Sequence, residues 1–169
     1  FEISMAQSQY SNSEGIDSEI QLADTGYGQG QVLVNPLHLL SMYSMFVNDG
    51  NMIQPVLKYE ENAAAKIWKE QAVSAQTAQT VKQSLLSVIE NPSGTGASAK
   101  IDGVTMLGKT GTAEYSMTDG EKTHSWFVGF TNLDNPELVI SVIIEGYDGN
   151  AGAKAVPIAK QVLDSYYYQ

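Results

Sequence analysis

The region from residue 104 to residue 145 most constrains the fold. It contains three stretches rich in β-branched and aromatic residues, at 104–115, 125–130 and 138–145. Their connections are short and carry the turn pairs Asp119-Gly120 and Asn135-Pro136. Because a parallel pair of strands needs a crossover of a dozen or more residues, such connections predict antiparallel neighbours. We therefore predict a three-stranded antiparallel meander.

Helices are predicted before and after this meander along the chain. Asn35 is a good N-cap and Pro36 suits the first helical position, which predicts a helix over 36–47. Ser74 begins a second helix over 74–90 whose apolar residues recur at helical spacing. A third helix is predicted at 152–166, with Ile158 and Val162 among the residues facing the sheet. We predict a loop-rich segment at 1–24, a small hairpin or arm at 52–71, and an α+β fold.

The first predicted strand carries a short reactive-site pattern, Lys109-Thr110-Gly111-Thr112. The ammonium of Lys109 and the hydroxyl of Thr110 can bind a carboxylate. Gly111 has no Cβ, so an acyl group can lie against the backbone. The backbone N–H of Thr112 can then point at a developing oxyanion. A lysine-containing strand without chemical consequence explains so short a pattern about equally well.

The same residues also fit a phosphate-binding pattern. Residues 103–110 match G-x-x-x-x-G-K-[ST], and 138–145 could serve as an apolar strand that ends in a metal-binding carboxylate. That interpretation needs a helix starting at the Lys-Thr pair. The residues before Lys109 favour a strand, and Gly111-Thr112 is a poor helix opening. We therefore predict against a nucleotide-binding loop.

Composition excludes several classes of partner. The chain of 169 residues has a net charge of −10, and all nine basic residues are lysines. Nucleic-acid binding needs a basic patch, so we predict no nucleic-acid partner. There is no cysteine for a thiolate site, and we predict no metal and no cofactor. No apolar run is long enough to span a bilayer. The sequence starts at Phe1, so we expect it to be a piece of a longer protein.

Several motifs occur together in a defined order. In that order, the chain from residue 20 on resembles the C-terminal half of the transpeptidase domain of class B penicillin-binding proteins. The resemblance is to the low-affinity, methicillin-resistance-type group of Gram-positive bacteria in particular. The motifs that carry it lie at 26–30 (Gly-Tyr-Gly-Gln-Gly), 35–37, 94–96 (Gly-Thr-Gly), 108–114 (Gly-Lys-Thr-Gly-Thr-Ala-Glu) and 124–130.

The resemblance implies a D,D-transpeptidase that cross-links peptidoglycan stem peptides ending in D-Ala-D-Ala through an acyl-serine, and that β-lactams acylate. It implies that residues 25–169 are the C-terminal part of that domain, in a parent anchored at the extracytoplasmic face of the plasma membrane. It assigns carboxylate binding and the acyl site to Lys109, Thr110 and Gly111, and the oxyanion donor to Thr112. The implied substrate-binding residues are Tyr27, Gln29 and Glu114.

One departure from the family pattern matters for activity. The sequence contains neither Ser-x-x-Lys, which supplies nucleophile and base, nor Ser-x-Asn. We predict that this chain alone cannot be acylated. The resemblance also implies a five-stranded sheet of which only the last three strands are present, so we predict an exposed edge and a homodimer. A β-lactam sensor, a serine β-lactamase and a purely structural half of a domain remain alternatives.

Overall fold

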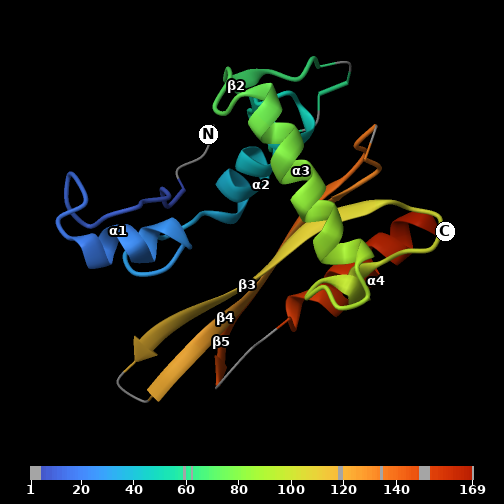
Figure 1. Ribbon diagram of the computed structural model, residues 1–169. Coiled ribbons are helices and arrows are strands. Elements are labelled where there is room, and N and C mark those ends of the chain that lie inside the picture. Colours follow the sequence, from blue (N-terminus) through green and yellow to red (C-terminus); the bar gives the residue numbers. More distant parts are fainter. Residues whose placement is uncertain are drawn as a thin grey trace.

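The computed structural model describes residues 5–58, 60–61, 63–117, 120–133, 135–148 and 153–168. The described residues form the expected α+β fold (Figure 1). The helices are α1 Glu19–Gly26, α2 Pro36–Ser44, α3 Ala75–Glu90 and α4 Ala155–Tyr167, with 3₁₀ turns η1 Met45–Val47 and η2 Ala97–Ala99. The strands are β1 Met52–Ile53, β2 Ile67–Lys69, β3 Met106–Met117, β4 Gly120–Thr131 and β5 Val139–Asp148. The turn residue predicted at 119 and the helix start predicted at 152 lie outside the described residues.

The predicted meander is confirmed. The sheet order is β3-β4-β5, and both pairs are antiparallel. β4 begins five residues before its predicted start, because its polar first half continues the ladder opposite β3, with Lys122 opposite Tyr115. β3 is one edge of this sheet, and Lys109 lies opposite Val128.

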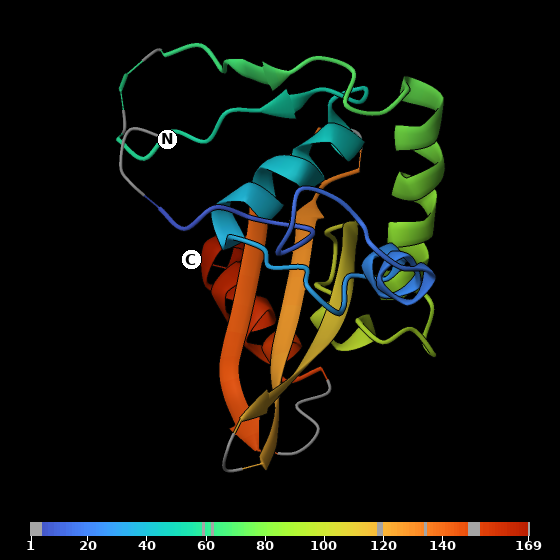
Figure 2. The same ribbon diagram turned by 90° about the vertical axis from the view of Figure 1, so that its left-hand side faces the viewer.

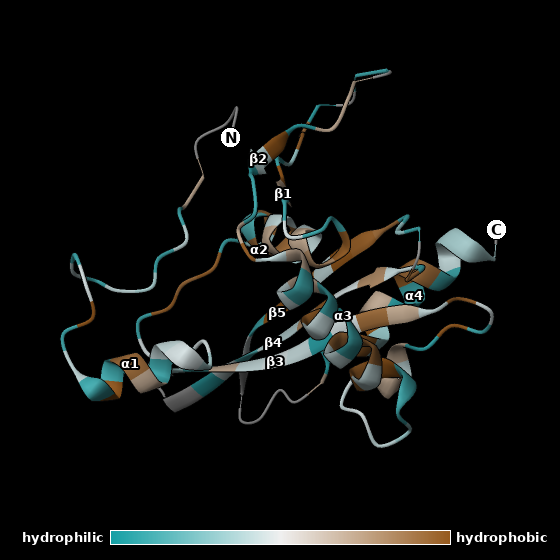
Figure 3. Ribbon diagram, turned by 45° about the horizontal axis from the view of Figure 1, so that its top comes forward, coloured by the Kyte–Doolittle hydropathy of each residue, from teal (hydrophilic) through white to brown (hydrophobic). Residues whose placement is uncertain are grey.

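Helices cover both faces of the sheet. Figure 2 shows α2 in front of the strands and α4 behind them, with α3 beside β3. Because side chains alternate along a strand, Leu107 packs on the α2 and α3 side while Met106 packs on the α4 side. Figure 3 shows the strongly hydrophobic ribbon segments where these helices meet the sheet. The sheet therefore has a buried end, and the Lys-Thr-Gly pattern follows directly after the buried residues of β3, with Lys109 opposite the buried Val128.

The predicted helix starts are confirmed at atomic detail. The side chain of Asn35 accepts a hydrogen bond from Leu37 N at 2.9 Å, and that of Ser74 accepts one from Thr77 N at 3.0 Å. The helix predicted over 36–47 instead ends at Ser44 and tightens into η1. The predicted hairpin at 52–71 is confirmed as the antiparallel pair β1–β2.

Two sequence predictions were wrong. α1 begins inside the segment predicted to be loop-rich, with Ser18 as its N-cap, and continues to Gly26, two residues beyond it. The helix was missed because it has only eight residues and no apolar stripe; Ile20 is 75% exposed. In α4, Ile158 and Val162 are exposed because the buried stripe consists of residues 155, 156, 159 and 163, one 100° step away. None of the helices in the described part of the chain is long and apolar enough to cross a membrane.

Candidate active site

The hydrogen-bond phase of β3 decides which backbone groups face its outer edge. Asn132 N–H donates to the carbonyl of Thr105 at 2.8 Å, in register with the β3–β4 ladder. In an antiparallel ladder, residues two apart point their backbone groups to the same side. Thr110 and Thr112 are an odd number of residues from Thr105, so their N–H and C=O groups point away from β4. The backbone donor predicted for an oxyanion therefore points outward from the sheet.

A cavity of about 360 Å³ lies along this edge. It brings together the Lys-Thr-Gly strand, the loop after α1 and the beginning of α2. A Cβ on Gly111 would lie 3.3 Å from the Cβ of Trp126 on the neighbouring strand. A side chain at this position would therefore crowd Trp126, and glycine leaves that space open. Its lining residues are Tyr27, Gly28, Gln29, Val34, Leu39, Lys109, Thr110, Gly111, Thr112, Ala113 and Trp126.

Lys109 is the fourth residue of β3 and its side chain is exposed. Its Nζ donates to the carbonyl of Thr110 at 2.8 Å, so the ammonium lies at the outer edge of the strand. A phosphate-binding loop would place this lysine at the start of a helix. The observed strand excludes that geometry.

Gln29 reaches the strand from a loop 83 residues away in sequence. Its Nε2 donates to the outward-facing carbonyl of Thr112 at 3.0 Å. The loop is held by the C-terminal cap of α1, in which Gln29 N donates to Asp24 O at 2.9 Å and Gly28 N donates to Thr25 O at 3.1 Å. Gly28 takes the left-handed position of this cap, with φ of 81°.

Tyr27 lines the cavity, whereas Glu114 does not. Tyr27 is 69% exposed, and its hydroxyl donates to Asp24 Oδ1 at 2.8 Å. This hydrogen bond and the negative charge of Asp24 raise the pKa of Tyr27 above its ordinary value, and the charge of Glu114 adds a smaller effect. Glu114 is exposed and is not among the lining residues, so of the predicted site residues it is the one outside the cavity.

Thr95 was not predicted as a site residue. Its Oγ1 lies 2.7 Å from Oγ1 of Thr110, which joins the loop after α3 to the Lys-Thr-Gly strand. The signal available in the sequence was a threonine between two glycines, Gly94 and Gly96. Such a pattern indicates an unusual backbone conformation, but it does not indicate which residue the threonine side chain contacts.

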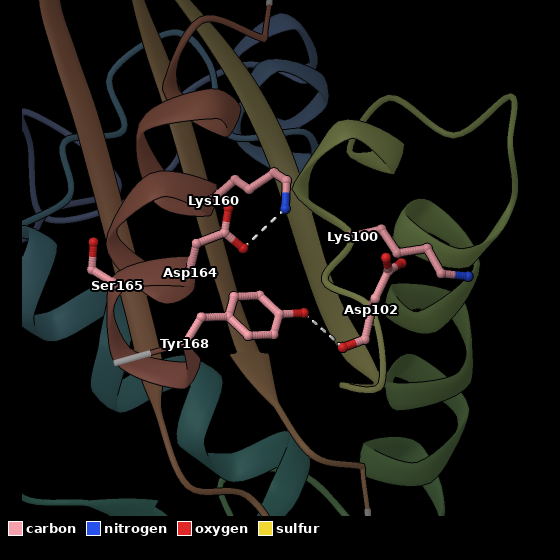
Figure 4. Close-up of a pocket in the computed structure, with 6 residues that line it drawn as sticks. All are labelled: Lys100, Asp102, Lys160, Asp164, Ser165 and Tyr168. Atoms are coloured by element: carbon pink, nitrogen blue, oxygen red, sulfur yellow. Dashed lines mark hydrogen bonds and ion pairs between the residues drawn. The ribbon is translucent and has the colours of Figure 1, made fainter.

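A second cavity, of about 620 Å³, lies between the C-terminal half of α4 and the loop after η2 (Figure 4). Both of its lysines are paired with carboxylates, Lys100 with Glu90 outside the cavity and Lys160 with Asp164 inside it. Lys160 Nζ lies 3.0 Å from Asp164 Oδ1, and Tyr168 donates to the carbonyl of Asp102 at 2.9 Å. It offers no reactive constellation. Across the described residues, no cluster of three His, Cys, Asp or Glu side chains is placed to hold a metal ion.

Comparison with known proteins identifies the family of this chain. Residues 3–164 match the family described as "Penicillin binding protein transpeptidase domain". The chain belongs to this family. The resemblance inferred from the order of the motifs is thereby confirmed.

Relatives of this transpeptidase-domain chain come from diverse bacteria. It is 34% identical to penicillin-binding protein 3 of Bacillus subtilis, over 92% of this chain and 24% of the relative. It is 28% identical to the peptidoglycan D,D-transpeptidase MrdA of Haemophilus influenzae, over 85% of this chain and 25% of the relative. The chain thus spans about a quarter of the length of these relatives.

A solved structure supports the fold independently. The structure of penicillin-binding protein A from M. tuberculosis, an imipenem acyl-enzyme complex, matches with a TM-score of 0.77 at 24% identity. The match covers 98% of this chain and 37% of that chain. Nearly all of this chain therefore adopts the arrangement found in part of a penicillin-binding protein.

Proposed function

We propose that this chain forms one wall of the active site of a peptidoglycan D,D-transpeptidase, residues 25–169 being the C-terminal part of the transpeptidase domain. The serine nucleophile would come from residues outside this sequence. The observation that carries the proposal is the β3 edge, where the Lys109 ammonium and the outward backbone of Thr112 border one cavity. The relative from H. influenzae bears the name of this activity.

The proposed reaction has two acyl-transfer steps. The serine oxygen attacks the carbonyl carbon of the D-Ala-D-Ala peptide bond, the C–N bond breaks, and the terminal D-Ala leaves with the proton. An amine of a second stem peptide then attacks the ester carbonyl, the C–O bond breaks, and the serine regains its proton. A β-lactam presents a comparable carbonyl to the same serine, and its acyl-enzyme persists.

Each residue of the β3 edge has a role in this scheme. Lys109 and Thr110 bind the carboxylate of the ligand, Gly111 leaves room for the acyl group, and Thr112 N–H stabilises the oxyanion. An extended peptide can add to the edge as another strand and donate an amide N–H to the carbonyl of Thr112. Gln29 holds that carbonyl until the ligand replaces it.

Tyr27 and Glu114 are proposed to contact the ligand further out. Tyr27 lines the cavity, and Glu114 lies on β3 just beyond Thr112. Both are exposed, so they are suited to contact the peptide beyond the reacting bond.

Labelled penicillin and a stem peptide test the activity in the longer protein that contains this sequence. We expect stable acylation and exchange of the terminal D-Ala. Fast hydrolysis of the penicillin would indicate a serine β-lactamase, and stable acylation without peptide exchange would indicate a sensor; either result contradicts the proposal. The 169-residue chain alone is expected to remain unlabelled.

The role of Lys109 has its own test. Lys109→Met keeps most of the side-chain length and removes the ammonium. We expect it to lower the acylation rate about a hundredfold, the order of loss seen when one preorganised transition-state contact is removed. Lys66→Met, on an exposed position just before β2, is the matched control and should acylate like the wild type.

Peptidoglycan lies outside the plasma membrane, and we propose that the protein works at that extracytoplasmic face, anchored by a segment outside this sequence. A labelled penicillin that does not cross membranes should reach the protein in intact cells. Labelling that requires broken cells would contradict this location.

The edge of β5 supports a proposal about assembly. Among the described strands, none pairs with β5 on the side away from β4. An apolar cavity of about 380 Å³ lies beside it, lined by Leu37 and Leu40 of α2 and by Val139, which is 36% exposed. An open strand edge beside apolar surface favours pairing with another chain. We propose that the 169-residue chain, studied alone, pairs at this edge with a second copy of itself.

Sedimentation over a wide concentration range tests this assembly. We expect a dimer that dissociates on dilution, and Val139→Lys should shift it toward monomer because a charge at a strand edge opposes pairing. A monomer at every concentration would contradict the proposal.

A further inference from the structure

The hydroxyl of Thr110 has a partner from outside its own strand. Its Oγ1 lies 2.7 Å from Oγ1 of Thr95, in the loop that follows α3. Between two hydroxyls, one donates and the other accepts. A threonine that donates to Thr110 leaves the Thr110 proton available for a ligand, while still fixing where its oxygen lies.

The loop around Thr95 is closely packed at the glycine on either side. A Cβ on Gly94 would lie 2.2 Å from the carbonyl oxygen of Val88, and one on Gly96 would lie 2.7 Å from Cδ1 of Ile89. Gly96 N also donates to the Val88 carbonyl at 3.2 Å. These contacts hold the backbone on both sides of Thr95 against the end of α3.

The end of α3 is itself fixed relative to the sheet. Ile89 is 1% exposed and packs in the same cluster as Met106, at the start of β3. The distance between Thr95 and Thr110 is therefore set by α3, by β3 and by the closely packed loop that follows α3. Such support is what a positioning contact needs, because each neighbour of the functional group must itself be held.

We propose that Thr95 is a positioning residue for the Lys-Thr-Gly strand. By donating to Thr110, it keeps the Thr110 side chain in one rotamer with its proton directed toward the carboxylate of the ligand. Thr95 acts through Thr110 and touches no reacting atom. This inference rests on the proposed function and extends it to the recognition of the ligand's carboxylate.

Acylation of the longer protein by penicillin measures the effect. Thr95→Val keeps the shape and removes the hydroxyl, and we expect the second-order acylation rate to fall about three- to tenfold, the value of one hydrogen bond. Thr95→Ser should restore most of the rate. Thr80→Val is the matched control, because the Thr80 hydroxyl donates to the carbonyl of Gln76 within α3, away from the site, and it should leave the rate unchanged.

A double-mutant cycle separates positioning from a general loss of structure. In a Thr110→Val background, Thr95→Val should cause no further loss. The methyl ester of penicillin, which lacks the carboxylate, should acylate wild type and Thr95→Val at similar rates. An equal loss with acid and ester, or an additive loss in the cycle, would overturn the proposal.

The 169-residue chain itself offers a test that needs no reaction. Three-bond side-chain couplings of Thr110 should report one rotamer in the wild type and averaged rotamers in Thr95→Val. A single rotamer in the variant would refute positioning by Thr95. If the longer protein is not acylated at all, the proposed function fails, and these couplings still decide the role of Thr95.

Discussion

Single glycines decide how closely side chains approach the sheet. Gly108 and Gly129 lie opposite each other on β3 and β4, and the fully buried ring of Phe127 lies across both. A Cβ on Gly108 would lie 2.9 Å from Cζ of Phe127, and one on Gly129 would lie 2.6 Å from the carbonyl oxygen of Leu107. The glycine that precedes Lys109 is therefore required by packing before any chemistry is considered.

Gly129→Ala should destabilise the chain by about 1–3 kcal/mol, because the new methyl group meets a backbone carbonyl that cannot move without distorting the ladder. Urea unfolding followed by circular dichroism measures this change. Gly15→Ala is the control, since its Cβ would meet no atom within 4 Å. Equal stability of the two variants would contradict the packing explanation.

At the level of elements, α1 positions the loop that carries Gln29 to the site. The helix buries little apolar surface, so its order depends on hydrogen bonds, at its two caps and from the buried Gln21 to Ser11 and Gln31. Its C-terminal cap requires a left-handed residue, and Gly28 supplies it with φ of 81°. Gln29 follows directly and is thereby directed at Thr112.

Two glycine substitutions in this element should act in opposite directions. Gly28→Ala forces a Cβ into the left-handed region and should cost about 1–2 kcal/mol of local stability. Gly26→Ala lies in the last helical position with open space around it, and should stabilise the helix by up to about 1 kcal/mol. Hydrogen exchange of the α1 amides measures both. Faster exchange in both variants would show that the cap is not what orders α1.

At the scale of the whole molecule, helices cover both faces of the sheet. Tyr43 of α2 packs between α3 and the strands β3 and β4. Its ring packs with a cluster formed by Leu85, Leu107 and Phe130, and its centroid is 5.5 Å from that of Phe46. Burial raises the pKa of Tyr43 above its ordinary value of 10.0. The packing between α2 and the sheet therefore favours the neutral phenol.

This pKa makes stability depend on pH on the alkaline side. Below pH 10 the phenol is neutral in both states; above it, the unfolded chain ionises first, so the free energy of unfolding falls as pH rises through the folded pKa. Tyr43→Phe removes this loss, and its stability should fall less steeply between about pH 9 and about pH 11. Urea unfolding across this range measures the difference; parallel curves for variant and wild type would contradict it.

The sequence by itself determined the meander, the caps of α2 and α3 and the strand that carries Lys109. Each of these depends on residues within a few positions of one another: tight turns, β-branched runs, and a capping side chain before a helix. The Lys-Thr-Gly pattern could be placed on a strand for the same reason. Local chemistry decides such features before any packing occurs.

Only the tertiary structure decided how the site is assembled. The outward phase of Thr112 follows from the ladder with β4, and the contacts of Gln29 with Thr112 and of Thr95 with Thr110 join segments 83 and 15 residues apart. No local pattern specifies such pairs, because each depends on where α1 and α3 come to rest against the sheet.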